Sequence, residues 1–142
     1  MQVTRQADYA LRAMLYLARL YSINPNQRAS TSKIAETQQI PLSFLAKIIS
    51  QLSIARLVTT VRGAKGGVNL ARSPEEISLL DVVEAIEGPI SLSECSKDPS
   101  NCAFGNTCPI HEIWCEAENE VIRKLKQATF DVLLEREKAL ME

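Results

Sequence analysis

The chain has 142 residues, 46% of them hydrophobic, and a formal net charge of -1 at pH 7. This is enough for one domain with a hydrophobic core, or one small domain with an appendage. No run approaches the roughly 20 apolar residues of a membrane span, and the N-terminus lacks the apolar core of a signal peptide. We therefore expect a cytoplasmic protein that makes no membrane contact.

Charge is divided unevenly along the chain. Residues 1–72 hold ten Lys and Arg side chains against only Asp8 and Glu36, whereas residues 73–142 hold six basic and fifteen acidic side chains. A basic segment of this kind attracts polyanions such as nucleic acid. The first half of the chain is therefore predicted to bind one, and chance is the weaker explanation of so large a difference.

An amphipathic helix is predicted over residues 4–22. Thr4 can cap it, and its apolar stripe comprises Ala7, Leu11, Met14, Leu15 and Ala18. Asp8 lies four residues before Arg12, a spacing that favours a surface ion pair on the helix.

Two shorter helices are predicted next, the first capped near Ser30 and the second over residues 42–55. The apolar residues of the second are expected to face the core: Leu42, Leu45, Ile48, Ile49 and Leu52. Its opposite face presents Ser43, Phe44, Lys47, Ser50 and Gln51 to solvent or a partner. Such a pair is typical of a helix-turn-helix, although any two short helices give this pattern.

A β-hairpin is predicted from the alternating residues of 57–61 and 68–70. Its tip carries Arg62 and Lys65 among three glycines, a shape suited to following a phosphate backbone or entering a narrow groove. A nucleotide-binding glycine loop is the rival interpretation. The segment lacks the Walker spacing and a helix directly after its last glycine, so we favour a DNA-binding wing.

The remaining helices follow Pro74. Ser78 can cap one with the apolar face Leu79, Val82, Val83 and Ile86, which Gly88 and Pro89 end. A long helix starting near Pro109 carries the apolar seam Ile110, Trp114, Ala117, Val121, Leu125 and Ala128, and residues 129–140 form a last helix. A small domain has little core to cover this seam, which favours pairing with the same helix of a second subunit over packing within one chain.

Three of the four cysteines and the only histidine follow the pattern C-x6-C-x5-C-x2-H, as Cys95, Cys102, Cys108 and His111. Thiolates and imidazole bind zinc or iron–sulfur clusters. Structural zinc usually takes cysteines about two to four residues apart, so the wider gaps here favour a cluster. Cys115 shares a helix face with His111 and is expected to be buried, with a reserve ligand as the alternative. No orienting partner for a catalytic Cys–His pair is evident, so we do not expect an enzyme.

In this order of elements the chain resembles the Rrf-type regulators, the family of IscR, NsrR, RirA and CymR. The most specific segments are TRQADYAL (4–11), VRGAKGGVNL (61–70), DVVEAIEG (81–88) and residues 95–114. The resemblance implies a homodimeric winged helix-turn-helix transcription factor, mainly α with a small β-hairpin and a long C-terminal dimerisation helix. It also implies that the state of an iron–sulfur cluster alters operator binding. From the expected two-fold dimer we predict a near-palindromic operator in double-stranded DNA.

The resemblance implies two ligand sets. Cys108 and His111 followed by Trp114 look like IscR, in which three cysteines and that histidine hold a [2Fe-2S] cluster. Asp8 is similar to the aspartate that ligates a [4Fe-4S] cluster from the other subunit in NsrR. We expect [2Fe-2S] in preference to [4Fe-4S], with His111 as fourth ligand and Asp8 as the alternative.

These patterns together predict three parts: a winged helix-turn-helix DNA-binding domain over residues 1–88, a cysteine-rich cluster-binding loop over 89–110, and a dimerisation helix with a C-terminal helix over 111–142. The expected function is regulation of transcription in response to iron–sulfur status, redox state or nitric oxide. Two alternatives stay open. One is a DNA-binding regulator with a structural zinc, and the other is a scaffold or delivery protein for iron–sulfur clusters on the same fold.

Overall fold

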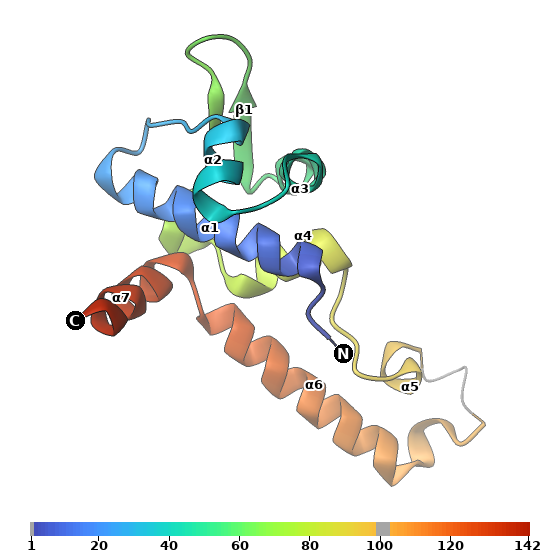
Figure 1. The fold of residues 1–142 in the computed structure, drawn as a ribbon. Helices are drawn as coiled ribbons and strands as arrows, with labels where there is room; N and C mark the ends of the chain where they lie inside the picture. The colour runs from blue at the N-terminus through green and yellow to red at the C-terminus, as the bar shows by residue number, and fades with distance from the viewer. Residues whose placement is uncertain (1, 99–102) are drawn as a thin grey trace.

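The computed structural model describes residues 2–98 and 103–142. Its helices are α1 (Arg5–Ile23), α2 (Thr31–Gln38), α3 (Leu42–Ile54), α4 (Leu79–Glu87), α5 (Glu94–Lys97), α6 (Pro109–Gln127) and α7 (Phe130–Met141). Strands β1 (Val58–Val61) and β2 (Gly67–Leu70) and the 3-10 turns η1 (Pro74–Glu76) and η3 (Gly105–Thr107) complete the described elements. The arrangement confirms the predicted mainly helical fold with one hairpin (Figure 1).

Three helices begin at the hydroxyl residues that the sequence indicated. The Oγ1 atom of Thr4 accepts a hydrogen bond from the backbone N–H of Ala7 at 3.2 Å, and the Oγ of Ser30 accepts one from that of Lys33 at 3.1 Å. Ser78 forms a reciprocal capping box at the start of α4. Because the first N–H groups of a helix have no partner within it, these caps define where α1, α2 and α4 start.

The main core is built around α1. Its buried face packs against α2, α3, the hairpin and α7, through the residues Ala10, Ala13, Met14, Leu17, Ile34, Leu45, Ile48, Leu52, Val58, Val68 and Phe130. Leu42 was predicted to join this core, and that prediction was wrong, because its side chain is 52% exposed. Side chains lean toward the N-terminus of their helix, so the first residue of α3 projects beyond its packed turns.

The hairpin is antiparallel, with Val58 opposite Leu70 and Val61 opposite Gly67. The segment before α2 adds a bridge to it, in which Ala29 and Val68 exchange backbone hydrogen bonds of 3.0 and 2.8 Å. Gly67 has a φ of +139°, and a Cβ atom there would lie 2.7 Å from the carbonyl oxygen of Ala29. Glycine at this position therefore allows the third segment to approach, which ties the hairpin to the core.

A second, smaller cluster joins α4 to α6. Leu80, Val83 and Ile90 are buried in it, and Leu11, Val121, Ile122 and Leu125 pack around them. Sequence analysis missed Leu80, which lies beside the predicted apolar face of α4 and contacts this cluster instead of the main core. Only the C-terminal half of α6 is held in this way, and the N-terminal half extends away from the body of the molecule (Figure 1).

The chain then returns to the main core through α7. The backbone N–H of Phe130 donates to the carbonyl of Ile77 at 3.0 Å, and that of Leu79 donates to Ala128 at 2.9 Å. The Phe130 side chain is 1% exposed and packs in the same core as α1. Helix α7, which belongs to the third predicted part of the chain, thus shares the core of residues 1–88, and the three-part division remains a prediction.

Candidate nucleic-acid interface and metal centre

Helix α3 presents a polar surface with one aromatic side chain. Ser43, Phe44, Lys47 and Ser50 are exposed, whereas Gln51 is half-buried. The helix is anchored from behind by Leu45, Ile48 and Leu52, which are completely buried, so its outer face has a fixed orientation. Five side chains predicted to contact a partner therefore lie along one helix, with Gln51 at the edge of that surface.

The Phe44 ring packs against Tyr9 of α1, a residue that the sequence did not single out. The Phe44 ring, 48% exposed, lies 6.2 Å from the ring of Tyr9 with an interplanar angle of 54°. The Arg12 guanidinium lies over the Tyr9 ring, 5.0 Å from its centre, and its Nη1 donates to the carbonyl of Gln38 at 3.0 Å. Tilted aromatic pairs and cation–π contacts are attractive, so α1 and the end of α2 support the exposed Phe44 ring.

The tip of the hairpin presents Arg62 and Lys65, both exposed. The turn is tight, since a Cβ atom on Gly66 would lie 2.0 Å from the carbonyl oxygen of Val61. Across the strands, Thr59 Oγ1 donates to Asn69 Oδ1 at 2.6 Å. The two cations are thus carried on a braced loop that projects beyond the helices (Figure 1).

Asp8 lies on the exposed side of α1. Its Oδ2 atom is 3.5 Å from Nε of Arg12, which confirms the predicted ion pair within this helix. The Asp8 side chain is 60% exposed and that of Arg12 is 41% exposed, so solvent screens the pair and it contributes little stability. Within this chain the Asp8 carboxylate is thus oriented along its own helix.

The cysteine segment connects α4 to α6. Cys95 lies in α5, with its Sγ 3.2 Å from Oγ of Ser93. Cys108 occupies the N-cap position of α6, His111 lies in the first turn of that helix, and α5 contacts α6. Cys102, the third predicted thiolate ligand, lies outside the described residues.

These donors suit a soft metal centre in kind, since the segment offers thiolates and one imidazole. In residues 2–98 and 103–142, no three His, Cys, Asp or Glu side chains gather into a group that could hold a metal ion. Cys115 was expected to be buried, but it is half-buried, with Sγ 3.5 Å from Nε2 of His111. The reason is its position in the projecting half of α6, where the chain supplies little cover.

The apolar seam of α6 is divided by the fold. Val121 and Leu125 pack against the cluster around Leu80, whereas Ile110 and Trp114 are exposed and Ala117 is half-buried. Ile113, which sequence analysis did not include, is also exposed. The projecting end of α6 therefore carries uncovered apolar side chains, Trp114 being 42% exposed.

On the solvated side of α6, a hydrogen bond from Arg123 to Glu120 at 2.7 Å lowers the pKa of the Glu120 carboxyl.

Comparison with known proteins gives consistent matches over nearly the whole chain. The family Rrf2, described as "Iron-dependent Transcriptional regulator", matches residues 3–136. The chain belongs to the Rrf2 family. The HTH-type transcriptional regulator NsrR of Halalkalibacterium halodurans is 34% identical over 142 residues, covering 99% of this chain and 94% of the relative.

Solved structures of Rrf2-type regulators have the same architecture. IscR of T. potens matches with a TM-score of 0.79 and 25% identity, covering 100% of this chain and 92% of the other. CymR, the global cysteine regulator of B. subtilis, matches with a TM-score of 0.75 and 28% identity, covering 94% and 95%. This Rrf2 protein is therefore a winged-helix transcriptional regulator and not an enzyme. No helix in its described residues is both long and apolar enough to cross a membrane.

Proposed function

We propose that this Rrf2 regulator is a homodimer that binds a near-palindromic DNA operator with an affinity set by an iron–sulfur cluster. The proposed ligands are Cys95, Cys102, Cys108 and His111. The observation that carries this proposal is the position of Cys108 and His111 at the projecting end of α6, beside the uncovered Trp114. A group held there would adjoin the surface through which a second subunit is expected to pack.

Two of the proposed ligands lie at the start of α6: Cys108 is its N-cap residue, and His111 follows three residues later in the first turn. Cys95 comes from α5, which contacts α6. A bound cluster supplies redox chemistry and reactivity toward small oxidants, and its properties depend on ligand identity and solvent exposure. Asp8 remains the alternative fourth ligand, contributed by the second subunit to the same site. A [2Fe-2S] cluster is proposed in preference to [4Fe-4S].

The experiment that tests the cofactor is an ultraviolet–visible spectrum of anaerobically purified protein together with iron, sulfide and zinc analysis. Visible charge-transfer bands with iron and sulfide would support the cluster. Zinc alone in a colourless sample would favour a DNA-binding regulator with a structural metal. A cluster without operator binding in any cluster state would favour a scaffold or delivery protein.

For the dimer, we expect Trp114→Glu to convert the protein to a monomer at micromolar concentration. Burying an unpaired carboxylate in a subunit interface costs several kcal/mol, which is enough to shift the equilibrium between monomer and dimer toward the monomer. Sedimentation velocity measures the change. Leu140→Glu is the matched control, because Leu140 is also exposed but lies outside α6, and it should leave the dimer intact. A monomeric parent protein at this concentration would contradict the proposal.

The proposed DNA complex places the exposed face of α3 in the major groove of each half-site, with the half-sites about one helical turn apart. Lys47 can donate to guanine acceptors and the Phe44 ring can pack on a thymine methyl. Arg62 and Lys65 at the hairpin tip are suited to phosphate or minor-groove contacts. The support for this arrangement is the common exposure of these side chains on two elements fixed to one core.

Two substitutions separate phosphate contact from base readout. Lys65→Ala is expected to weaken binding to all sequences similarly and to lower the slope of log affinity against log salt by about one. Lys47→Ala is expected to reduce the difference in binding free energy between operator and random DNA by about 1 to 3 kcal/mol per half-site. Fluorescence anisotropy at several salt concentrations measures both. Parent-like binding by both variants would show that this surface does not read DNA.

A further inference from the structure

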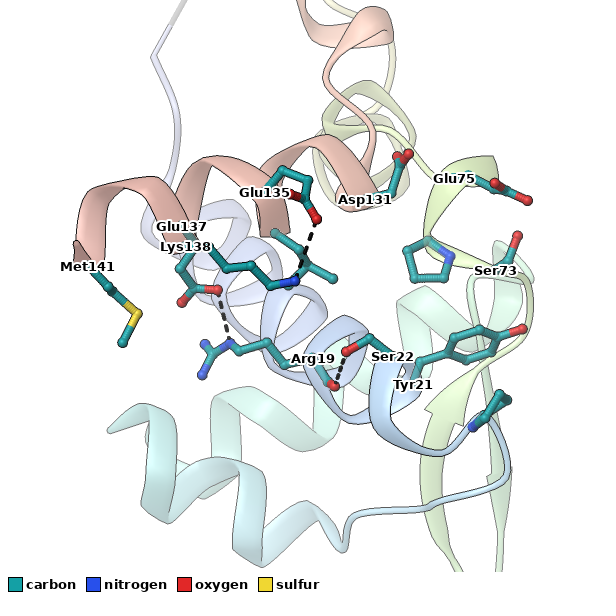
Figure 2. Close-up of a pocket in the computed structure, with 13 residues that line it drawn as sticks. Arg19, Tyr21, Ser22, Ser73, Glu75, Asp131, Glu135, Glu137, Lys138 and Met141 are labelled. Atoms are coloured by element: carbon teal, nitrogen blue, oxygen red, sulfur yellow. Dashed lines mark hydrogen bonds and ion pairs between the residues drawn. The ribbon is translucent and has the colours of Figure 1, made fainter.

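A second candidate site lies away from both the cysteine segment and α3. A cavity of about 620 Å³ opens between the C-terminal part of α1, η1 and α7 (Figure 2). Tyr21, Pro74, Leu134 and Met141 contribute apolar surface to it. This volume falls within the range of about 300 to 1,000 Å³ that is typical of small-molecule sites. The cavity can therefore hold an organic molecule of modest size.

The charged groups around the cavity have an excess of carboxylates. Its two cations are already engaged, since Arg19 Nε lies 3.4 Å from Oε2 of Glu137 and Lys138 Nζ lies 3.5 Å from Oε1 of Glu135 (Figure 2). Two further acids, Glu75 from η1 and Asp131 from the first turn of α7, also line it. Neither makes an ion pair within the described residues, although Asp131 accepts a hydrogen bond from Thr129.

We propose that this cavity binds a small organic cation, an amine attached to an apolar or aromatic body. The apolar body would contact Tyr21, Pro74 and Leu134, and the ammonium group would be attracted by Glu75 and Asp131. An anion of the same size would have to share Arg19 or Lys138 with the carboxylate already beside it, and it would also face the negative charges of Glu75 and Asp131. Charge complementarity thus selects the cation, and the site does not depend on the proposed cluster or operator.

The test uses three probes of nearly equal size: 2-phenylethylamine as the cation, 3-phenylpropanoate as the anion and 2-phenylethanol as the neutral molecule. Methyl resonances of Leu134 and Met141 are followed by NMR during titration at pH 7. The amine is expected to shift both in a saturable way at roughly millimolar concentration, as its few atoms allow. The alcohol should bind more weakly than the amine. The propanoate should cause no saturable change.

A double variant, Glu75→Gln with Asp131→Asn, should bind the amine at least about threefold more weakly than the parent. The expected effect is modest because each exposed ion pair contributes little free energy. Both substitutions preserve side-chain shape. The control Glu84→Gln removes an exposed charge on α4, outside the cavity, and should bind as the parent does. Three results would overturn the proposal: no saturable shift with the amine, equal binding of the propanoate, or parent-like binding of the amine by the double variant.

Discussion

Cys108→Ala is expected to yield a colourless protein after anaerobic purification, with iron and sulfide lost together. The reason is that removing one of three thiolates leaves an iron without one of its strong ligands, and the nearest other thiol of α6, Cys115, lies one turn beyond His111. Cys95→Ala and Cys102→Ala should have the same effect. Each variant should also bind the operator with the affinity of the apo protein, a change of about 5- to 150-fold if the coupling has its usual size.

The matched control is Cys115→Ala, which removes the same type of atom one turn beyond His111 and should keep the visible absorption. His111→Ala should destabilise the cluster more than Asp8→Ala does. The opposite ranking would favour Asp8 of the second subunit as the fourth ligand. Equal operator affinity of the holo and apo proteins at several sites would contradict the proposed regulation of DNA binding by the cluster, without contradicting the presence of the cluster.

Phe130→Ala is expected to lower the free energy of unfolding by about 3 to 5 kcal/mol, the cost of removing a large aromatic side chain from a packed core. Phe130 is 1% exposed and packs in the core formed by α1, α2, α3 and the hairpin. Because α7 shares that core, the loss of stability should appear in the main unfolding transition, measured by urea denaturation followed by far-ultraviolet circular dichroism. The DNA-binding elements and α7 should thus unfold together.

Val132→Ala provides the comparison on the same helix. Val132 is 38% exposed, so its truncation should cost less than about 1 kcal/mol. A loss of similar size for the two variants would contradict the assignment of Phe130 to the core. A separate transition for α7, with the stability of the winged helix unchanged, would show that residues 111–142 form an independent part after all.

Much of the candidate site could be anticipated because its signals are local. The exposed positions on α3 follow from helical periodicity, and the three cysteines between residues 95 and 108 are visible as a cluster in the sequence itself. The contacts that support Phe44 could not be anticipated in this way. Tyr9 lies two helices before Phe44 in the chain, and only the packing of α1 against the start of α3 brings the two rings together.

By itself the sequence determined the helix starts at Thr4, Ser30 and Ser78, the hairpin, and membership of a regulator family, because caps, periodicity and motifs depend on neighbouring residues. The tertiary structure alone decided that Leu42 is exposed, that Phe130 completes the core, and that the seam of α6 is half covered and half free. A hydrophobic residue is buried only where another element covers it. That cover comes from residues far away in the chain, which no local pattern specifies.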